Sequence, residues 1–230
     1  MVGAGEIRLD DLAVDYDPIV DVGSGRLAGA DVVAPLVELT ELPTTAWRLV
    51  LLNALMTSVR WNQRGLVNRS FITSIAMGPE QFSDPLVERA ICAAVAGSGS
   101  NPNALQLTIT DEMLLHADED AITRLIDLTN LGVKLAVVGP HACTHTARHR
   151  DVLEVSLLRV SLTDHEQSLP PTLLERAAAL ELQLMATGVD DESSFVDARR
   201  HGVRYSTGDF HRSTQYFVEI DDVAVEPVRG

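Results

Sequence analysis

Residues 104–140 contain the pattern that most limits the folds open to this chain. A strand-like apolar run at 105–110 is followed by an amphipathic helical segment and a second apolar run at 133–138. The apolar positions on one face of the helical segment are Ile122, Leu125, Ile126 and Leu128. Gly132 fits the helix end, where a left-handed backbone costs least without a Cβ. Two apolar strands joined by one amphipathic helix form a βαβ unit, which favours a parallel sheet.

The rest of the chain repeats this alternation. Further strands are predicted at 15–21, 26–36, 71–77, 154–162, 182–189 and 203–207. Further helices are predicted at 41–64, 85–96, 170–179 and 191–202. A short turn at 23–25 joins the first two strands, so they should pair antiparallel. Repeating βα units indicate an α/β fold, a modified (β/α)8 TIM-like barrel with an antiparallel first strand.

A single domain is expected. Residues 1–14 are interpreted as an N-terminal lead-in and residues 15–230 as one barrel, because no low-complexity segment or interdomain linker interrupts them. The tail at 216–230 is expected either to add a short strand or to wrap around the outside. The length of 230 residues suffices for one α/β barrel.

The charge and the apolar runs exclude several classes of partner. The net charge is −15, from 33 acidic and 18 basic residues, which disfavours nucleic acid and acidic membrane surfaces. No apolar run is long enough to span a membrane, and the N-terminus has no apolar signal core. Cys92 and Cys143 are too few for a disulfide framework, so a cytoplasmic location is predicted. Lys134 is the only lysine.

Short motifs in the expected order carry a family resemblance from about Tyr16 to Phe210. They are Tyr16-Asp-Pro-Ile-Val-Asp, Gly25-Arg-Leu-Ala-Gly29, Pro79-Glu-Gln-Phe82 with Asp84-Pro85, Asn130-Leu-Gly-Val-Lys-Leu-Ala136, Ala186-Thr-Gly-Val-Asp190 and Gly202 with Tyr205-Ser-Thr-Gly208. Together they resemble the EAL domain, a modified (β/α)8 barrel of bacterial cyclic di-GMP signalling. The resemblance implies an active site that hydrolyses this dinucleotide with two divalent metals.

The positions that carry function in the EAL domain differ here. The glutamate of the Glu-Ala-Leu motif falls on Asp31, and the arginine that grips the dinucleotide falls on Pro35. The metal-binding asparagine falls on Ala76, and the first glutamate of the motif E-I-T-E falls on Thr108. The resemblance therefore implies that these positions are vestiges of a pocket.

The second half of the motif set is equally changed. The paired aspartates of D-D-F-G fall on Val138 and Gly139. The lysine of K-I-D falls on Arg159 and its aspartate on Ser161. The segment after Arg159 is also shorter than in the family, which affects a region that often supports dimer formation, so a homodimer stays open.

The last motifs retain one acidic residue. The glutamate of A-E-G-V-E falls on Thr187, the second acidic position keeps Asp190, and the glutamine that positions the ligand falls on Thr207. Two-metal hydrolysis needs several converging oxygen ligands, and Mg²⁺ gives up its water reluctantly. We therefore expect no catalytic residue, no cofactor and no bound Mg²⁺, and we interpret the chain as a pseudo-phosphodiesterase.

Each remaining candidate has a structural alternative. Asp111 is either a ligand or, as we favour, the N-cap of the next helix. Residues 190–192 are expected to interact with a helix dipole. A metal cluster of His141, Cys143, His145 and His149 competes with exposed or locally bonded histidines in an irregular loop, which we favour. Arg159 is expected either to supply the positive charge of a residual anion-binding pocket or to form an ion pair with Asp31 or Asp190. Trp47 and Trp61 share one helix face and are expected to pack either in the core or on the surface.

The resemblance and the changed motifs together predict a regulator. We expect a catalytically inactive EAL-like protein that binds a protein partner through the altered loops at 138–150 and 164–171. The alternative is a non-hydrolysing cyclic di-GMP receptor with weak binding centred on Arg159, which proline at position 35 and the net charge oppose.

Overall fold

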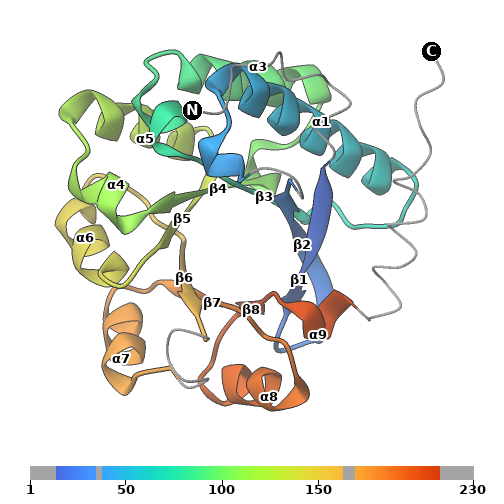
Figure 1. The fold of residues 1–230 in the computed structure, drawn as a ribbon, viewed down its shortest axis with the longest axis vertical. Coiled ribbons are helices and arrows are strands. Elements are labelled where there is room, and N and C mark those ends of the chain that lie inside the picture. Colours follow the sequence, from blue (N-terminus) through green and yellow to red (C-terminus); the bar gives the residue numbers. More distant parts are fainter. Residues whose placement is uncertain (1–13, 35–37, 163–168, 213–230) are drawn as a thin grey trace, which may run out of the picture.

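The structure, a computed structural model, describes residues 14–34, 38–162 and 169–212. Its centre is a closed barrel in which the strands follow one another in sequence order, from β1 to β8 (Figure 1). The strands are β1 (Asp15–Asp21), β2 (Arg26–Val33), β3 (Ile72–Ala76), β4 (Leu105–Thr110), β5 (Lys134–Val138), β6 (Leu157–Ser161), β7 (Gln183–Thr187) and β8 (Tyr205–Ser206).

The first strand alone runs against its neighbours. β1 pairs antiparallel with β2 and with β8, whereas every pair from β2–β3 to β7–β8 is parallel. The predicted TIM-like barrel with an antiparallel first strand is therefore confirmed. Because β2 to β8 are parallel, their carboxyl ends meet at one end of the barrel, where barrel enzymes place their chemistry.

Helices surround the barrel in Figure 1. The longer ones are α1 (Thr44–Gln63), α3 (Val87–Ser98), α5 (Glu119–Asn130), α6 (Ala142–His149), α7 (Pro171–Ala179) and α8 (Glu192–Arg200). The short ones are α2 (Pro79–Ser83), α4 (Asp111–Leu115), α9 (Asp209–Arg212) and the 3-10 turns η2 (Leu39–Glu41) and η3 (Pro102–Ala104). Within the described residues, no helix is both long and apolar enough to cross a membrane.

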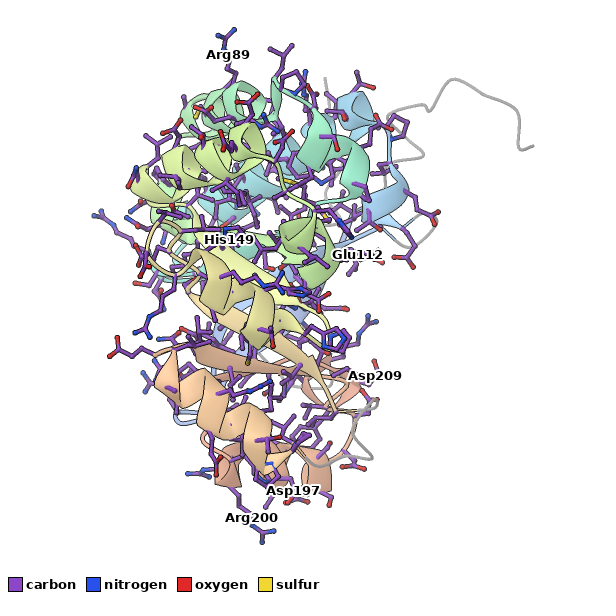
Figure 2. The ribbon with its side chains drawn as sticks, turned by 90° about the vertical axis from the view of Figure 1, so that its left-hand side faces the viewer. Arg89, Glu112, His149, Asp197, Arg200 and Asp209 are labelled. Carbon is purple, nitrogen blue, oxygen red and sulfur yellow. The ribbon has the colours of Figure 1, made fainter. Side chains whose placement is uncertain are left out.

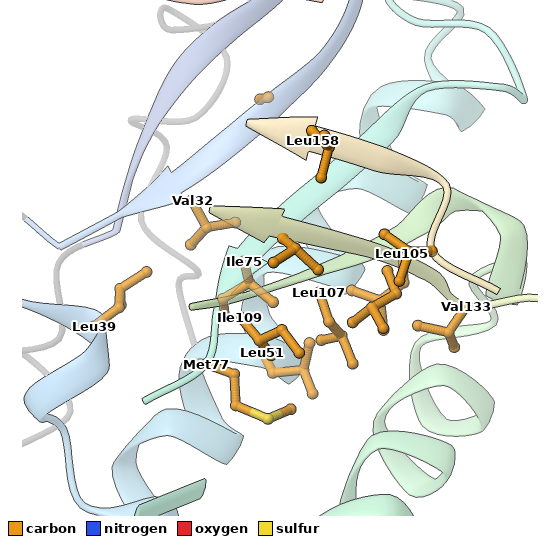
Figure 3. Packing of buried hydrophobic residues seen from close by; sticks show 14 of the residues in the cluster. Val32, Leu39, Leu51, Ile75, Met77, Leu105, Leu107, Ile109, Val133 and Leu158 are labelled. Atoms are coloured by element: carbon orange, nitrogen blue, oxygen red, sulfur yellow. The ribbon is translucent and has the colours of Figure 1, made fainter. Parts of the chain in front are cut away.

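The main core lies between the barrel wall and the helices. Outward-facing side chains of β3 and β4, such as Ile75 and Leu107, pack with Leu51 of α1 (Figure 3). Trp47 and Trp61 are both buried in this core, the first of the two expected outcomes, and Trp61 contacts the ring of Tyr16 edge-on at 4.8 Å between centroids. Such edge-to-face pairs add about 1 kcal/mol to the burial of the rings.

A smaller cluster fills the barrel itself. Ile19, Ala136, Leu157 and Met185 are buried together inside it. Successive strand residues face opposite sides, so these inward residues alternate with the outward ones of the main core. The cluster divides the interior into a carboxyl end and an amino end.

The structure corrects several predicted boundaries. β2 ends at Val33 instead of position 36, and the helix predicted at 85–96 is α3, which begins at Val87. The loop expected to hold His145 is instead helix α6. Its polar and histidine-rich sequence lacks an obvious apolar stripe, because only Ala142, Cys143, His145 and Thr146 turn inward. The tail at 216–230 lies outside the described residues.

Candidate functional site at the carboxyl end of the barrel

Most of the predicted pocket positions lie on the inner face of the barrel wall at its carboxyl end. Val32, Ile75, Ile109, Val137 and Val160 belong to the outer core. Their neighbours therefore face inward: Asp31, Ala76, Thr108, Val138, Arg159 and Ser161. The strand register places Ala76 beside Thr108, Val138 beside Arg159, and Ser161 beside Thr187. In Figure 2, Glu112 and Asp209, which follow β4 and β8, lie toward the same end.

The centre of this end is an ion pair between Asp31 and Arg159. The two terminal nitrogens of Arg159 each donate to one carboxylate oxygen of Asp31, both at 2.6 Å. The side chains are 12% and 13% exposed. The pair joins β2 to β6 across the barrel, and it is the first of the two pairings expected for Arg159. A planar two-point contact of this kind is the strongest form of an arginine–carboxylate interaction.

Two uncharged side chains extend the pair along the barrel wall. Arg159 Nη1 also donates to the hydroxyl of Ser74 at 3.3 Å, and the Gln106 amide donates to the same hydroxyl at 3.3 Å. Neither Ser74 nor Gln106 was singled out from the sequence. Their inward positions on β3 and β4 were readable from strand alternation, but their link to Arg159 required the closed barrel.

The charge state of the pair follows from burial and its partners. Burial works to lower the pKa of Arg159, but the charge of Asp31 and its hydrogen bonds outweigh this and raise the pKa. Asp17 lies opposite Asp31 in the β1–β2 register. Burial raises the pKa of Asp17, and Arg212, whose guanidinium lies 2.5 Å from that carboxylate, opposes the shift. Arg159 therefore stays charged against Asp31, with a second carboxyl group nearby.

Asp111 is tied to the loop after β5. Its Oδ2 accepts the backbone N–H of His141 at 2.6 Å, and its carbonyl oxygen lies 2.9 Å from Nδ1 of His145. The expectation that Asp111 caps the next helix is wrong: Thr110 is the N-cap of α4, and its hydroxyl accepts the N–H of Met113 at 3.2 Å. The threonine one residue earlier has the extended backbone that a cap needs.

Gly139 is fixed by this arrangement. Its φ of +137° is one that other residues rarely adopt, and a Cβ built there would lie 2.2 Å from Oδ1 of Asp111. Position 139, which the sequence resemblance matched to the second aspartate of D-D-F-G, therefore has no room for a side chain while Asp111 keeps its place.

The histidine-rich segment forms no metal centre in the described part of the chain. Cys143 and His145 are buried on the inner face of α6, and His141 is exposed. Burial raises the pKa of the Cys143 thiol, and the charge of Arg176 opposes this. No group of three or more His, Cys, Asp or Glu side chains there could hold a metal ion.

The remaining predicted positions have structural contacts. The hydroxyl of Thr187 approaches the carbonyl of Val160 at 3.5 Å, whereas the buried hydroxyl of Thr108 has no hydrogen-bond partner among the residues that the structure describes. Thr207 pairs through its backbone N–H with the carbonyl of Ala186 at 2.9 Å. Pro35 lies outside the described residues.

The acidic residues after β7 shape the start of a helix. Asp190 is exposed and accepts the backbone N–H of Asp209 at 3.1 Å. Asp191 is the N-cap of α8, and its bonds from the backbone and hydroxyl of Ser194 lower its pKa. Asp191 and Glu192 therefore lie at the start of α8, where acidic side chains interact favourably with the helix dipole. Among the described residues, Asp190 forms no ion pair with Arg159.

A cavity of about 520 Å³ opens beside the ion pair. It is lined by Val138, Gly139, His141, Cys143, Arg159, Ser161, Leu173 and Arg176, among others. Arg176 of α7 was not singled out from the sequence, because a single arginine in a helix gives no sign of which cavity it will face. The cavity presents two guanidinium groups beside apolar wall.

This donor set does not fit two divalent cations. Two such ions need several converging oxygens, with carboxylates foremost. Among the described inward positions, Ala76, Val138 and Gly139 supply no side-chain oxygen, and the carboxylate of Asp31 is already bonded through both oxygens to Arg159. An arginine in this place would repel a cation.

Comparison with known proteins identifies similar folds. The family model described as "EAL domain" matches residues 30–213. The EAL domain of Mycobacterium smegmatis DcpA is similar at 23% identity and a TM-score of 0.76, covering 92% of this chain and 97% of that one. No curated protein sequence gives a significant match.

Two further similar structures were solved with a dinucleotide. The PaMucR phosphodiesterase in complex with c-di-GMP has 17% identity, a TM-score of 0.73, and coverage of 86% and 90%. The Xanthomonas citri FimX EAL domain in complex with c-diGMP has 18% identity, a TM-score of 0.69, and coverage of 87% and 86%. At these identities the likeness shows a shared fold.

Proposed function

Because the chain belongs to the EAL domain family of cyclic di-GMP signalling, we propose that it is a catalytically inactive member that regulates by binding a protein partner. Hydrolysis in this family depends on metal-bound oxygen nucleophiles, so the proposal rests on what the chain offers where those metals would bind.

The observation that carries the proposal is the ion pair between Asp31 and Arg159. The sequence resemblance matches Asp31 to the family's glutamate, and both of its oxygens accept hydrogen bonds from Arg159 at 2.6 Å. To bind a cation, the carboxylate would have to release a buried guanidinium, which would then lack a counter-charge. Leaving one partner of a buried pair alone costs about 3–5 kcal/mol, which opposes metal binding at this position.

The neighbouring positions supply no substitute carboxylate. The sequence resemblance matches the paired aspartates to Val138 and Gly139, and Gly139 packs against Asp111. Asp111 itself is engaged by the backbone of His141. These contacts support a carboxyl end of the barrel whose side chains stabilise the fold and are not available to bind metal.

Incubation of the full chain with cyclic di-GMP tests the loss of activity. Without metal and with Mg²⁺, Mn²⁺ or Ca²⁺, we expect no linear dinucleotide above the buffer blank by chromatography, while an active EAL phosphodiesterase run in parallel releases it. Metal-dependent release by the wild-type chain that ends when Asp31 is changed to Ala would overturn the proposal.

The contact surface is proposed to include the exposed face of α6 within residues 138–150. His141, Thr144 and Arg148 are exposed there, and His141 and Thr144 line the cavity at the carboxyl end. Of the second predicted segment, residues 164–168 lie outside the described residues and Leu169 is buried. A surface freed from catalysis can change to suit a partner without loss of the fold.

Charge reversal tests this surface. Arg148→Glu should abolish capture of a protein partner from cells of the source organism, while Arg89→Glu, on the outer face of α3, should leave it unchanged (Figure 2). Both variants should show unchanged thermal unfolding. Equal capture by both variants would place the contact surface elsewhere.

A cyclic di-GMP receptor is the second candidate, and one observation favours it. The cavity of about 520 Å³ at the carboxyl end is lined by Arg159 and Arg176, and guanidinium groups suit phosphates. Calorimetric titration with cyclic di-GMP separates the candidates. Micromolar binding that is lost in both Arg159→Ala and Arg176→Ala would favour the receptor over the protein-binding regulator.

A further inference from the structure

A second cavity lies at the opposite end of the barrel. It has a volume of about 470 Å³. Its inner wall is formed by residues at the starts of strands, namely Ile72, Gln106, Lys134, Leu157, Gln183 and Tyr205. Its outer wall comes from the end of α6 and the connections to β6 and β7. The buried cluster around Ala136 and Met185 separates it from the ion pair at the carboxyl end.

Lys134 is the charged group at the inner wall of this cavity. It is the only lysine in the chain, and it is half-buried. Within the described residues its ammonium group has no ion pair or hydrogen bond. Burial lowers the pKa of its amine. A charged amine in this position is poorly solvated and is paired with none of the described carboxylates, so an anionic ligand could pair with it.

A second cation lies at the rim. Arg150 donates to the carbonyl oxygen of Ala179 at 3.2 Å and forms no ion pair with a described carboxylate. Glu154 and Glu181 also line the rim, and both are exposed. The rim therefore bears charges of both signs, while the interior bears only Lys134.

The remaining wall combines apolar side chains with the uncharged polar side chains of Gln106, Thr146, Ser156 and Gln183. Leu153, Val155, Leu157 and Leu182 line the cavity together with Tyr205. A patch of leucine side chains beside one convergent cation, with uncharged polar groups between them, suits a small ligand with an acidic head and a short hydrocarbon body. The two rim glutamates and the net charge of −15 oppose a second negative charge on that ligand.

We propose that the cavity at the amino end of the barrel binds a small amphipathic monoanion of the monocarboxylate class, with Lys134 pairing the carboxylate and the leucine-rich wall covering the hydrocarbon. This site is separate from the carboxyl end, so the proposal stands whether the carboxyl end binds a protein or a nucleotide.

The single lysine makes a direct test practical. Reductive methylation of the full chain with ¹³C-formaldehyde labels only Lys134 and the N-terminal amine, and it keeps both charges. Titration with sodium hexanoate should shift the Lys134 signal to saturation, with a dissociation constant on the order of 1 mM, and leave the N-terminal signal in place. Hexanol and hexylamine, with the same chain length, should bind at least about tenfold more weakly.

Variants measured by calorimetry complete the test. Lys134→Met keeps the length of the side chain but removes the charge, and it should weaken hexanoate about tenfold or more. Arg89→Met, the same kind of change on the outer face of α3, should have no effect. Glu154→Gln should tighten hexanoate about twofold, because it removes a negative charge at the rim.

Three results would overturn the proposal. They are the absence of a saturable Lys134 shift with hexanoate or 4-phenylbutyrate up to about 50 mM, hexanol binding as tightly as hexanoate, and unchanged hexanoate affinity in a folded Lys134→Met variant. Any of them would show that Lys134 reaches solvent through the cavity without serving an anion.

Discussion

Replacing Arg159 with methionine should destabilise the fold, because the change leaves Asp31 buried without a counter-charge. The carboxylate would lose two hydrogen bonds of 2.6 Å, and it would still face Asp17, its partner in the β1–β2 register. Methionine fills much of the space of the arginine stem, so the loss reports mainly on the charge.

The size of the effect follows from the burial of the pair. The side chains are 13% and 12% exposed, so bulk water screens the interaction only weakly. Breaking a buried pair costs about 3–5 kcal/mol, and the residual exposure argues for about 3 kcal/mol here. Asp31→Asn should cost a similar amount because it leaves Arg159 uncompensated. The double variant should cost about 2 kcal/mol less than the sum of the single variants.

Urea unfolding followed by tryptophan fluorescence measures these differences. Trp47 and Trp61 are 0% and 2% exposed, so their emission reports on the core. The matched control is Asp197→Asn, which removes the partner of Arg200 on α8 at the surface (Figure 2). The arginine of that pair is 73% exposed, and the change should cost less than about 0.5 kcal/mol.

Additive effects would refute this account of the carboxyl end. If Arg159→Met and Asp31→Asn each cost less than about 1 kcal/mol and sum in the double variant, the pair is not coupled in solution. Asp31 would then be available to other ligands, and the argument for an inactive barrel would lose its main support.

Three further changes test other parts of the structure. Gly139→Ala should destabilise the fold by more than about 2 kcal/mol in the same urea assay, because the added Cβ would clash with Asp111. The control is Gly202→Ala, where φ is also positive but no atom lies near the added Cβ. It should cost about 1 kcal/mol. Lys134→Met should be more stable than the wild type near neutral pH. This difference in stability between variant and wild type should shrink as pH rises toward about 10.4. Burial lowers the pKa of Lys134 in the folded chain, so the folded chain loses the proton at a lower pH than the unfolded chain does, and the wild type gains stability over that range. Burial also lowers the pKa of His211, so the free energy of unfolding of the wild type should fall as pH drops below about 6.5. Urea titrations from pH 7 to 5 should show a smaller fall for the His211→Gln variant.

The order of strands and helices was readable from the sequence because it depends on local pattern. The βαβ unit at 104–140 appears as β4, α5 and β5, and the turn after Asp21 joins an antiparallel pair. Predictions from the sequence were wrong where the periodicity of apolar residues was weak. Helix α6 carries histidines and threonines on a short segment, and Thr110 took the capping role expected of Asp111 because the helix starts one residue earlier.

Some residues of the candidate site could be predicted from the sequence, and others could not. Strand alternation and the family motifs placed Asp31 and Arg159 at the carboxyl end, and pairing between them was one of the expected outcomes. The hydroxyl of Ser74 and the amide of Gln106, which hold Arg159 in line, were not found, because hydrogen bonds between strands depend on the register of the closed barrel.

The sequence by itself determined a βα barrel with few carboxylates at its strand ends, since side-chain type and the periodicity of apolar residues are local properties. Only the tertiary structure decided that Asp31 and Arg159, 128 positions apart, satisfy each other, and that Lys134 faces a cavity at the other end. The physical reason is that barrel closure sets which distant side chains share a buried volume, and burial in turn decides which charges must find a partner.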